Sequence, residues 1–383
     1  MSRIPFLLLS DGPAEPTGLA RIARDLASQI LTADLPVDLV QVGGVTPPVW
    51  TRWRHVALDR SEEWGARNVE AIYRSVWGSQ PGVLFAVWDP SRLFPYVRSD
   101  LPVQKWAYCA IDAENRWGGI GGPAREVIQQ FDRVLAYGRY GAEVIKRSGN
   151  GQPVQWLPHG INTDVYRAAY PVEIARDRLG PYAIGKTLIG CVMTNQPRKD
   201  FGLLFHALRL LRDRGWPLYL WLHTDMLVKA WSVQQLVEDF GLAKLVTVTG
   251  IDEQVSDRTM AAMYQACTVT VLPSLGEGFG YPLVESLAAG VPVVHTDYAG
   301  GATYVPKVEW RVPVREVRLE SVYGLSRPVM RAEDWANATE RVLRWRQEED
   351  PRVVREYCQG SVAHLDWAAL WNRWATWFRQ GLR

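Results

Sequence analysis

Two glutamates, Glu277 and Glu285, stand eight positions apart, and three glycines lie beside or between them: Gly276, Gly278 and Gly280. Glycine permits unusual backbone dihedrals and the close approach of a ligand. Carboxylates in such a setting can accept hydrogen bonds from neutral hydroxyl groups, as on a hexose or a ribose. The residue types and their spacing are therefore typical of a loop that grips a polyhydroxyl ligand.

The elements around these glutamates follow from the flanking sequence. Apolar residues at 269–272 predict a strand, and Pro282 suits the first turn of a helix over 283–289. Glu277 would then lie on the loop and Glu285 about one turn into the helix. Free N–H groups and the helix dipole at that N-terminus favour an anion such as phosphate. The segment thus predicts neighbouring sites for hydroxyls and for phosphate.

A basic pair, Arg198 and Lys199, lies between an expected strand at 188–193 and an expected helix at 201–214. A guanidinium fork and an ammonium can neutralise a diphosphate from two directions. Positive charge at a helix N-terminus opposes the helix dipole, which favours an anionic partner here. The alternative is two solvated charges at the start of a helix.

Other residues, in the first half of the chain, are weaker candidates for ligand binding. Gly18 opens an expected helix after the first strand, in a segment that lacks the G-x-G-x-x-G pattern of dinucleotide oxidoreductases. Asp112 and Glu114 follow a strand at 104–110, where open α/β sheets present ligand groups. Asp112 could contact a substrate hydroxyl or cap the strand end. His159 could orient a substrate or be a hinge histidine satisfied by backbone.

Length, composition and net charge limit the classes of protein to which the sequence can belong. A chain of 383 residues with 47% hydrophobic and 22% charged residues indicates a globular protein of two domains. A formal net charge of +2 gives no case for nucleic acid. The apolar run at the N-terminus is too short for a signal sequence or a membrane span. Four cysteines without a C-x-x-C pair predict buried free thiols in a reducing cytoplasm, and no zinc spacing or Asp-x-Asp suggests a metal.

Strands alternate with helices along most of the chain, which predicts a mostly parallel sheet in each of two Rossmann-like domains. Expected strands lie at 4–9, 37–42, 83–87, 104–110, 133–136, 154–157, 188–193, 218–222, 245–248, 268–272 and 291–295. Expected helices lie between them at 19–31, 67–76, 123–130, 140–146, 201–214, 232–240, 257–265 and 283–289.

The remaining pattern is helical, at 332–347 and 361–379, and the second helix carries a stripe of tryptophans. An amphipathic helix of this kind must bury its aromatic stripe somewhere. One expectation is packing back onto the first domain. The rival expectation is a helix on a membrane surface, with Arg373, Arg379 and Arg383 facing lipid phosphate.

The motifs L-P-S, G-F-G, P-L-x-x-E and A-x-G-x-P-V-V surround the two glutamates, and together they resemble the E-x7-E element of the family 4 retaining glycosyltransferases. The resemblance implies an α/β chain of the GT-B class, with two Rossmann-like domains facing across a cleft and a C-terminal helix crossing back to the first. The implied bounds are 1–168 for an acceptor domain, 169–360 for a nucleotide-sugar donor domain and 361–383 for the C-terminal helix.

The resemblance also implies residue roles. Glu277 would touch the donor sugar and Glu285 the nucleotide ribose, while Lys199 and Arg198 would hold the leaving phosphates. The family's arginine commonly stands several residues before its lysine, so the role passes more firmly to Lys199. Asp112 and Glu114 stand in the region where many relatives have a histidine that contacts the sugar, which leaves the identity of the sugar and the handling of the acceptor open. Further donor-binding residues implied are Gly18, Asn195, His159 and the amides of Gly278, Phe279 and Gly280.

The implied activity is hexosyl transfer with retention, from a nucleotide-diphospho-sugar to a hydroxyl of a saccharide, glycolipid or other acceptor, without a metal or cofactor. The implied location is the cytoplasm, with peripheral membrane contact as an option and no nucleic-acid partner. A nucleotide-sugar epimerase of the same fold and a non-catalytic carbohydrate-binding protein stay open as alternatives. The nucleotide, the sugar and the acceptor are not specified by the sequence.

Overall fold

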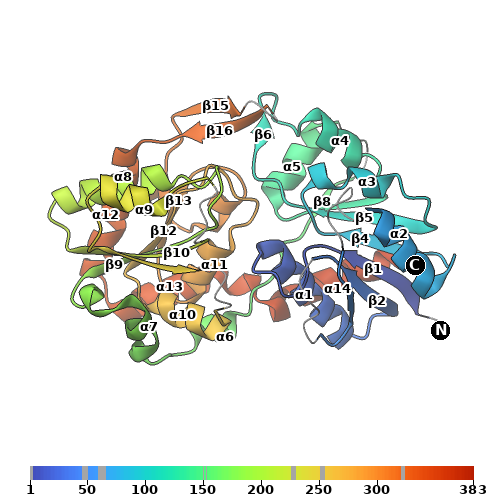
Figure 1. Cartoon of the computed structure of the whole chain (residues 1–383), viewed down its shortest axis with the longest axis horizontal. Coiled ribbons are helices and arrows are strands. Elements are labelled where there is room, and N and C mark those ends of the chain that lie inside the picture. The colour runs from blue at the N-terminus through green and yellow to red at the C-terminus, as the bar shows by residue number, and fades with distance from the viewer. Residues whose placement is uncertain are drawn as a thin grey trace. The chain divides into compact units, whose positions relative to one another are not determined.

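The computed structural model describes residues 3–44, 51–58, 66–149, 151, 153–225, 230–250, 255–320 and 324–383 (Figure 1). The chain forms two compact units. The first comprises the chain up to His159 together with Leu370–Arg383, and the second comprises mainly Gly160–Glu320 and Ser326–Ala369. The division after His159 falls earlier than the expected boundary at residue 168.

The first unit is built on a seven-stranded sheet in the order β3-β2-β1-β4-β5-β7-β8, and its strands pair in parallel. The central strands are buried on both faces, which explains their nearly continuous apolar sequences. Its strands are β1 (Ile4–Leu9), β2 (Val37–Val42), β3 (Arg54–Val56), β4 (Gly82–Ala86), β5 (Val103–Cys109), β7 (Arg133–Ala136) and β8 (Gln155–Trp156), with a short β6 (Glu114–Asn115) outside this sheet. Its helices are α1 (Gly18–Thr32), α2 (Ala66–Trp77), α3 (Phe94–Val97), α4 (Gly122–Ile128) and α5 (Arg139–Arg147).

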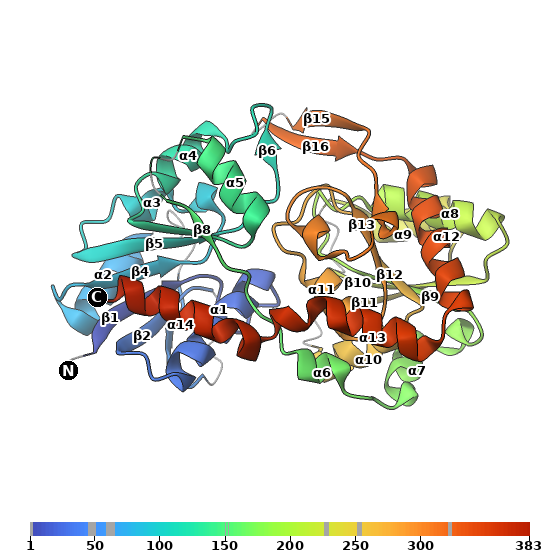
Figure 2. The ribbon, with the colours of Figure 1, turned by 180° about the vertical axis from the view of Figure 1, so that it is seen from behind.

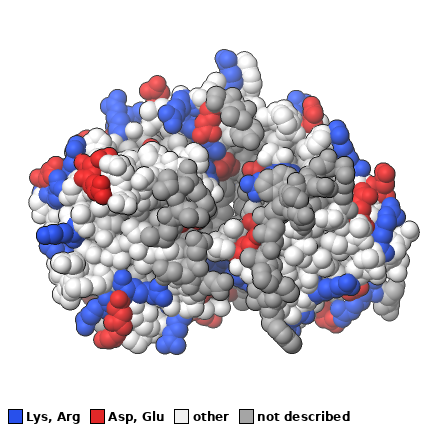
Figure 3. Space-filling view, in the orientation of Figure 1, with Lys and Arg blue, Asp and Glu red and all other residues white. Residues whose placement is uncertain are grey.

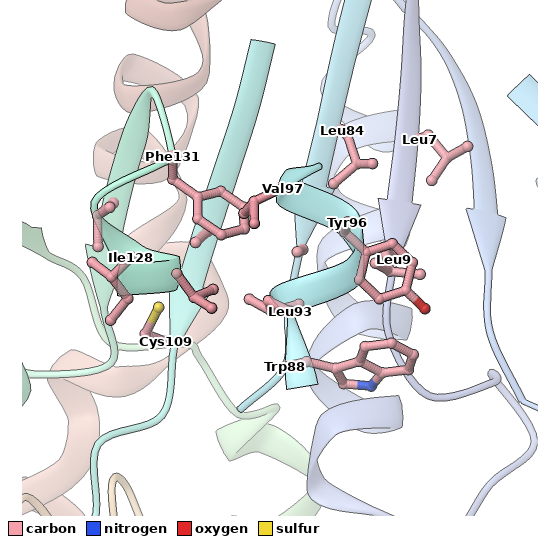
Figure 4. Close-up of a cluster of buried hydrophobic side chains, with 14 of the residues drawn as sticks. Leu7, Leu9, Leu84, Trp88, Leu93, Tyr96, Val97, Cys109, Ile128 and Phe131 are labelled. Atoms are coloured by element: carbon pink, nitrogen blue, oxygen red, sulfur yellow. The ribbon is translucent and has the colours of Figure 1, made fainter. Parts of the chain in front are cut away.

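One face of this sheet is covered by an apolar layer to which α2, α3, α4 and α5 contribute, and part of this layer is drawn in Figure 4. Leu7 pairs with Leu84 across β1 and β4, so both side chains point into this layer. Phe131 and Tyr96 pack from the helical side and are almost fully buried. The layer is a hydrophobic core that belongs to the first unit alone.

The opposite face is covered by the end of the last helix, α14 (Trp367–Gly381) (Figure 2). Phe378 packs against Phe6, with ring centroids 6.0 Å apart, and Trp377 packs against Trp106 at 5.2 Å. The Arg133 guanidinium lies 4.2 Å from the Trp377 ring centroid and donates to the Trp377 carbonyl at 3.0 Å. The tryptophan stripe is therefore buried in protein as first expected, and the membrane-surface alternative for this helix loses its basis.

The second unit carries a six-stranded sheet in the order β11-β10-β9-β12-β13-β14, again with parallel pairs. Its strands are β9 (Thr187–Val192), β10 (Leu218–Thr224), β11 (Val246–Gly250), β12 (Val269–Leu272), β13 (Val293–Thr296) and β14 (Arg311–Val312). Its helices are α6 (Thr163–Arg167), α7 (Val172–Leu179), α8 (Phe201–Asp213), α9 (Val233–Asp239), α10 (Asp257–Ala266), α11 (Tyr281–Ala288), α12 (Ala332–Glu348) and α13 (Pro351–Val362). Two parallel α/β units agree with the predicted fold class.

Some elements differ from the sequence expectation. The helix expected at 361–379 is broken, because α13 ends at Val362 and α14 begins at Trp367. Asp366 lies at the break, where its carboxylate accepts from Ala368 N at 2.8 Å and from the Thr163 hydroxyl at 2.6 Å. The strands β15 (Glu316–Glu320) and β16 (Leu325–Val329), neighbours in a third small sheet, were not expected, since β15 is exposed and charged.

Three further observations concern the cysteines, the helices and the surface charge of the described residues. The four cysteines are buried and free, as predicted. Among the described residues, no helix combines the length and apolarity that crossing a bilayer would require. On the face drawn in Figure 3, acidic and basic side chains are interspersed over the described surface.

Candidate functional site

Two loops of the second unit meet at the carboxyl edge of its sheet. One follows β9 and the other follows β12, and these strands are neighbours. Lys199 and Ser274 form an isolated antiparallel bridge between the loops. Leu275 N donates to the Arg198 carbonyl at 2.8 Å, and Asp200 N donates to the Pro273 carbonyl at 2.9 Å. Parallel α/β folds bind their ligands at this edge of the sheet. The basic pair and the glycine loop, both predicted from the sequence, therefore lie together there.

The centre of this site is a buried ion pair. Lys199 Nζ contacts Glu277 Oε1, and these side chains are only 5% and 9% exposed. Arg198 supports the same carboxylate, with Nη2 3.7 Å from Glu277 Oε2, and its Nε donates to the Gly276 carbonyl at 3.3 Å. Three of the predicted catalytic residues are therefore brought together.

The charges in this cluster depend on one another. Burial by itself would raise the pKa of Glu277, but Lys199 and Arg198 outweigh it and lower that pKa to about 2. Burial lowers the pKa of Lys199, and the Glu277 carboxylate opposes that shift. Glu277 is therefore ionised at neutral pH, and the ammonium beside it is held at a fixed position under the loop.

Glycines allow the loop to turn tightly above the ion pair. Gly280 has a φ of 88°, a left-handed conformation, at the N-terminus of α11. Gly301 N donates to the Glu277 carbonyl at 2.9 Å, and a Cβ on Gly300 would lie 2.3 Å from the Gly278 carbonyl oxygen. The side chain of Phe279 is buried between Tyr281 and Tyr304, so this residue has only its backbone to offer a ligand.

Glu285 lies on α11 and is held by two tyrosines. The Tyr166 hydroxyl donates to Oε1 and the Tyr264 hydroxyl to Oε2, each at 2.9 Å. Both tyrosines are completely buried and Glu285 is 5% exposed. These two bonds fix the orientation of the carboxylate on α11. The ribose contact of Glu285 stays a prediction.

The side chain of Asn195 holds backbone groups at the same edge of the sheet. Its Oδ1 accepts from Ala230 N at 3.2 Å and from Trp231 N at 3.0 Å, while Nδ2 donates to the Trp231 carbonyl at 2.8 Å. Its backbone N donates to the Asp225 carboxylate at 2.7 Å. The side-chain amide therefore braces the segment that follows β10, and its predicted donor contact stays a prediction.

His295 belongs to the site, although the sequence did not single it out. It is completely buried at the end of β13, and Nδ1 lies 2.8 Å from the Leu272 carbonyl, which assigns the proton to Nδ1. Burial lowers its pKa to about 4, so the ring is neutral at pH 7. A Cβ on Gly301 would lie 2.9 Å from His295 Nε2 and 2.9 Å from Glu277 Cβ. The neutral ring thus fills the space behind Glu277.

The predicted residues of the first unit follow different strands of one sheet. Gly18 begins α1 after β1, and Asp112 lies in the loop after β5; β1 and β5 are the two strands that flank β4. His159 is completely buried, with Nδ1 3.0 Å from the Tyr108 hydroxyl oxygen. Burial, and secondarily the charge of Arg21, lowers the pKa of His159 well below its usual range. A buried tyrosine hydroxyl thus holds His159, and its predicted role at a substrate stays a prediction.

The assigned residues are thus divided between the units: Gly18, Asp112 and His159 in the first, and Asn195, Arg198, Lys199, Glu277, Gly278, Phe279, Gly280 and Glu285 in the second. Across the described ranges, no three His, Cys, Asp or Glu side chains gather as metal ligands would. The second unit therefore provides a site with a buried cation, an arginine fork, two fixed carboxylates and a helix N-terminus.

The residues of this site lie in a segment of the chain that is similar to known proteins. Residues 186–344, which include Arg198, Lys199, Glu277 and Glu285, match the family model described as glycosyl transferases group 1. The D-inositol 3-phosphate glycosyltransferase of Mycobacteroides abscessus is 27% identical over 227 residues, which are 59% of this chain and 47% of the relative. The chain thus spans about half the length of that relative.

Solved structures agree at the level of the fold. Sucrose-phosphate synthase from Thermosynechococcus elongatus matches with a TM-score of 0.77 at 18% identity, covering 99% of both chains. The complex of Anabaena HepE with UDP-glucose matches with a TM-score of 0.72 at 15% identity, covering 99% of this chain and 100% of that one. These similarities confirm the predicted GT-B fold.

Proposed function

We propose that the chain is a retaining hexosyltransferase that moves a sugar from a nucleotide-diphospho-sugar to an acceptor hydroxyl. The observation that carries this proposal is the buried cluster of Lys199, Arg198 and Glu277 beneath the glycine loop. A cation held in a dry site at the edge of a sheet suits a leaving diphosphate. The carboxylates suit the hydroxyls on either side of that diphosphate.

In the proposed reaction the bond between the anomeric carbon and the diphosphate oxygen breaks, with oxocarbenium character on the sugar. The acceptor oxygen bonds to the same face of the anomeric carbon, and its proton passes to the departing phosphate oxygen. Lys199 and Arg198 neutralise the charge that develops on the diphosphate, and each preorganised contact is worth about 3 to 4 kcal/mol. This assignment requires no protein base and no metal ion.

Donor recognition is proposed for the second unit. Glu277 would bind sugar hydroxyls, Glu285 the ribose, and the amides of Gly278, Phe279 and Gly280 the sugar and phosphates. The UDP-glucose bound by the Anabaena neighbour supports a nucleotide-sugar donor in this fold. The first unit, with Asp112, is proposed to handle the acceptor. The name of the Mycobacteroides relative, an inositol phosphate glycosyltransferase, supports a polyol among the candidate acceptors.

The donor can be identified by thermal shift, because a ligand that binds the native state raises its stability by mass action. The full chain is screened against UDP-, GDP-, ADP- and dTDP-linked hexoses, and one nucleotide class should raise the melting temperature. The glycoside formed with that donor should keep the anomeric configuration, as read by proton NMR. An inverted product would remove the retaining assignment, and an epimerised donor in the absence of acceptor would point to an epimerase.

A further inference from the structure

Arg327, on β16, is an unusual charge in the second unit because it is only 5% exposed. An arginine side chain is rarely buried so deeply, since removing a guanidinium from water is costly unless partners compensate. In the pair of strands β15 and β16, here called the hairpin, β15 is mostly exposed, whereas Ser326 and Pro328 on either side of Arg327 are buried. The cost of burying the guanidinium must be compensated by nearby partners.

The guanidinium reaches the glycine-rich loop that follows β12. Its Nη1 donates to the Leu275 carbonyl at 3.4 Å, and its Nε lies 3.6 Å from Glu320 Oε2. The amide of Leu275 donates in turn to the Arg198 carbonyl at 2.8 Å. Leu275 is thus held from both sides, by the basic-pair loop and by the hairpin, just before Glu277.

The residue before Arg327, Ser326, contacts a second segment, which follows β13 and meets the glycine-rich loop at Glu277. The Tyr298 hydroxyl donates to the Ser326 carbonyl. Tyr298 begins the turn whose Gly301 N donates to the Glu277 carbonyl at 2.9 Å. Successive residues of β16 therefore contact the two segments that meet at Glu277.

We propose that Arg327 is a positioning residue for the donor site, which holds Leu275 so that Arg198 and Glu277 keep their geometry. It acts through the loop and touches no reacting atom. Glu320 offsets its charge at the edge of the hairpin. The assignment rests on the proposed function for its kinetic consequence, but the loop geometry can be tested without any reaction.

The first test is amide hydrogen exchange in the full chain without ligand. Arg327→Met keeps the side-chain length and removes the donors, so amides in 275–280 and at Gly301 should exchange at least tenfold faster. Exchange in α12 should not change. Arg318→Met, an exposed position on the same hairpin, is the matched control and should leave the loop protected.

The second test is kinetic, with the nucleotide sugar that gives the largest thermal shift. Arg327→Met should lower turnover about 10- to 100-fold, as a misplaced site does, with less change in the donor KM. Arg327→Lys should recover part of the loss, since an ammonium can reach one carbonyl. If Arg327→Met does not fold, Tyr298→Phe should show the same loop exchange in milder form.

Unchanged exchange in 275–280 together with wild-type turnover would overturn the positioning role. Faster exchange with no transfer activity even in the parent chain would keep the positioning role and reject the proposed function. A uniform rise in exchange throughout the second unit would assign Arg327 to general stability and would also overturn the proposal.

Discussion

Lys199 and Glu277 lie 78 residues apart in the sequence and form a buried ion pair at the carboxyl edge of the second sheet. Their loops follow neighbouring strands, β9 and β12. The pair places a cation in a water-poor site before any ligand arrives. Under the proposed function, a diphosphate at this site would meet charge that needs no rearrangement, which is the condition for strong electrostatic catalysis.

Replacing Lys199 by alanine should reduce turnover roughly 100- to 1000-fold, because one preorganised contact to the leaving group is lost. Glu277 would keep a buried charge without its nearest partner, which should cost about 3 to 5 kcal/mol of stability. The double variant Lys199→Ala/Glu277→Gln should recover stability but not turnover. The exposed Lys244→Ala is the control, and single-turnover kinetics with thermal unfolding provide the measurement. Wild-type turnover in Lys199→Ala would remove its role at the diphosphate.

The two tyrosines that donate hydrogen bonds to Glu285 should affect donor binding. Tyr166→Phe or Tyr264→Phe removes a hydrogen bond to a charged acceptor, worth about 1.5 to 3 kcal/mol, and lets the carboxylate move. We expect the donor KM to rise about tenfold with turnover less affected, and Glu285→Gln to show a larger rise. Tyr219→Phe, which removes another buried hydroxyl bonded to Thr247, is the control. Loss of stability with unchanged donor affinity would mean that Glu285 is only structural.

Acid stability should depend on Glu277. Its pKa in the folded chain, about 2, lies below the ordinary value, so the unfolded chain binds the proton more readily. The stabilisation is full above about pH 5 and falls as the pH drops towards 2, by on the order of 3 kcal/mol. Melting temperature measured from pH 6 to pH 2 should fall more steeply for the parent chain than for Glu277→Gln. Equal slopes would contradict the lowered pKa.

The last helix should stabilise the first unit. Trp374 is completely buried, and its Nε1 donates to the Pro158 carbonyl at 3.0 Å. Trp374→Ala should cost about 3 to 5 kcal/mol, and Trp374→Phe should cost less because the ring volume is partly kept. Trp117→Ala, at a position 78% exposed, should change the free energy of urea unfolding by less than about 0.5 kcal/mol. Equal effects at the two positions would mean that α14 contributes little to the core.

The sequence predicted local structure well where one physical signal was sufficient. Apolar runs flanked by turn residues located β1, β2 and β7 at their observed bounds, since buried parallel strands have nearly continuous apolar sequences. Short or exposed strands such as β3 and β15 carry no such signal and were missed. The break at Asp366 was missed too, because its carboxylate bonds to Thr163, 203 residues away.

By itself, the sequence determined the order of the elements, the glycine loop and the pairs Arg198–Lys199 and Glu277–Glu285, because residue type and spacing encode turns, helix starts and charge. Only the tertiary structure decided which of these groups meet. Lys199 joins Glu277, Tyr166 holds Glu285 from 119 positions away, and Arg327 holds Leu275 from 52 positions away. Which strands are neighbours in a sheet depends on how the whole unit packs, and the local sequence pattern does not specify it.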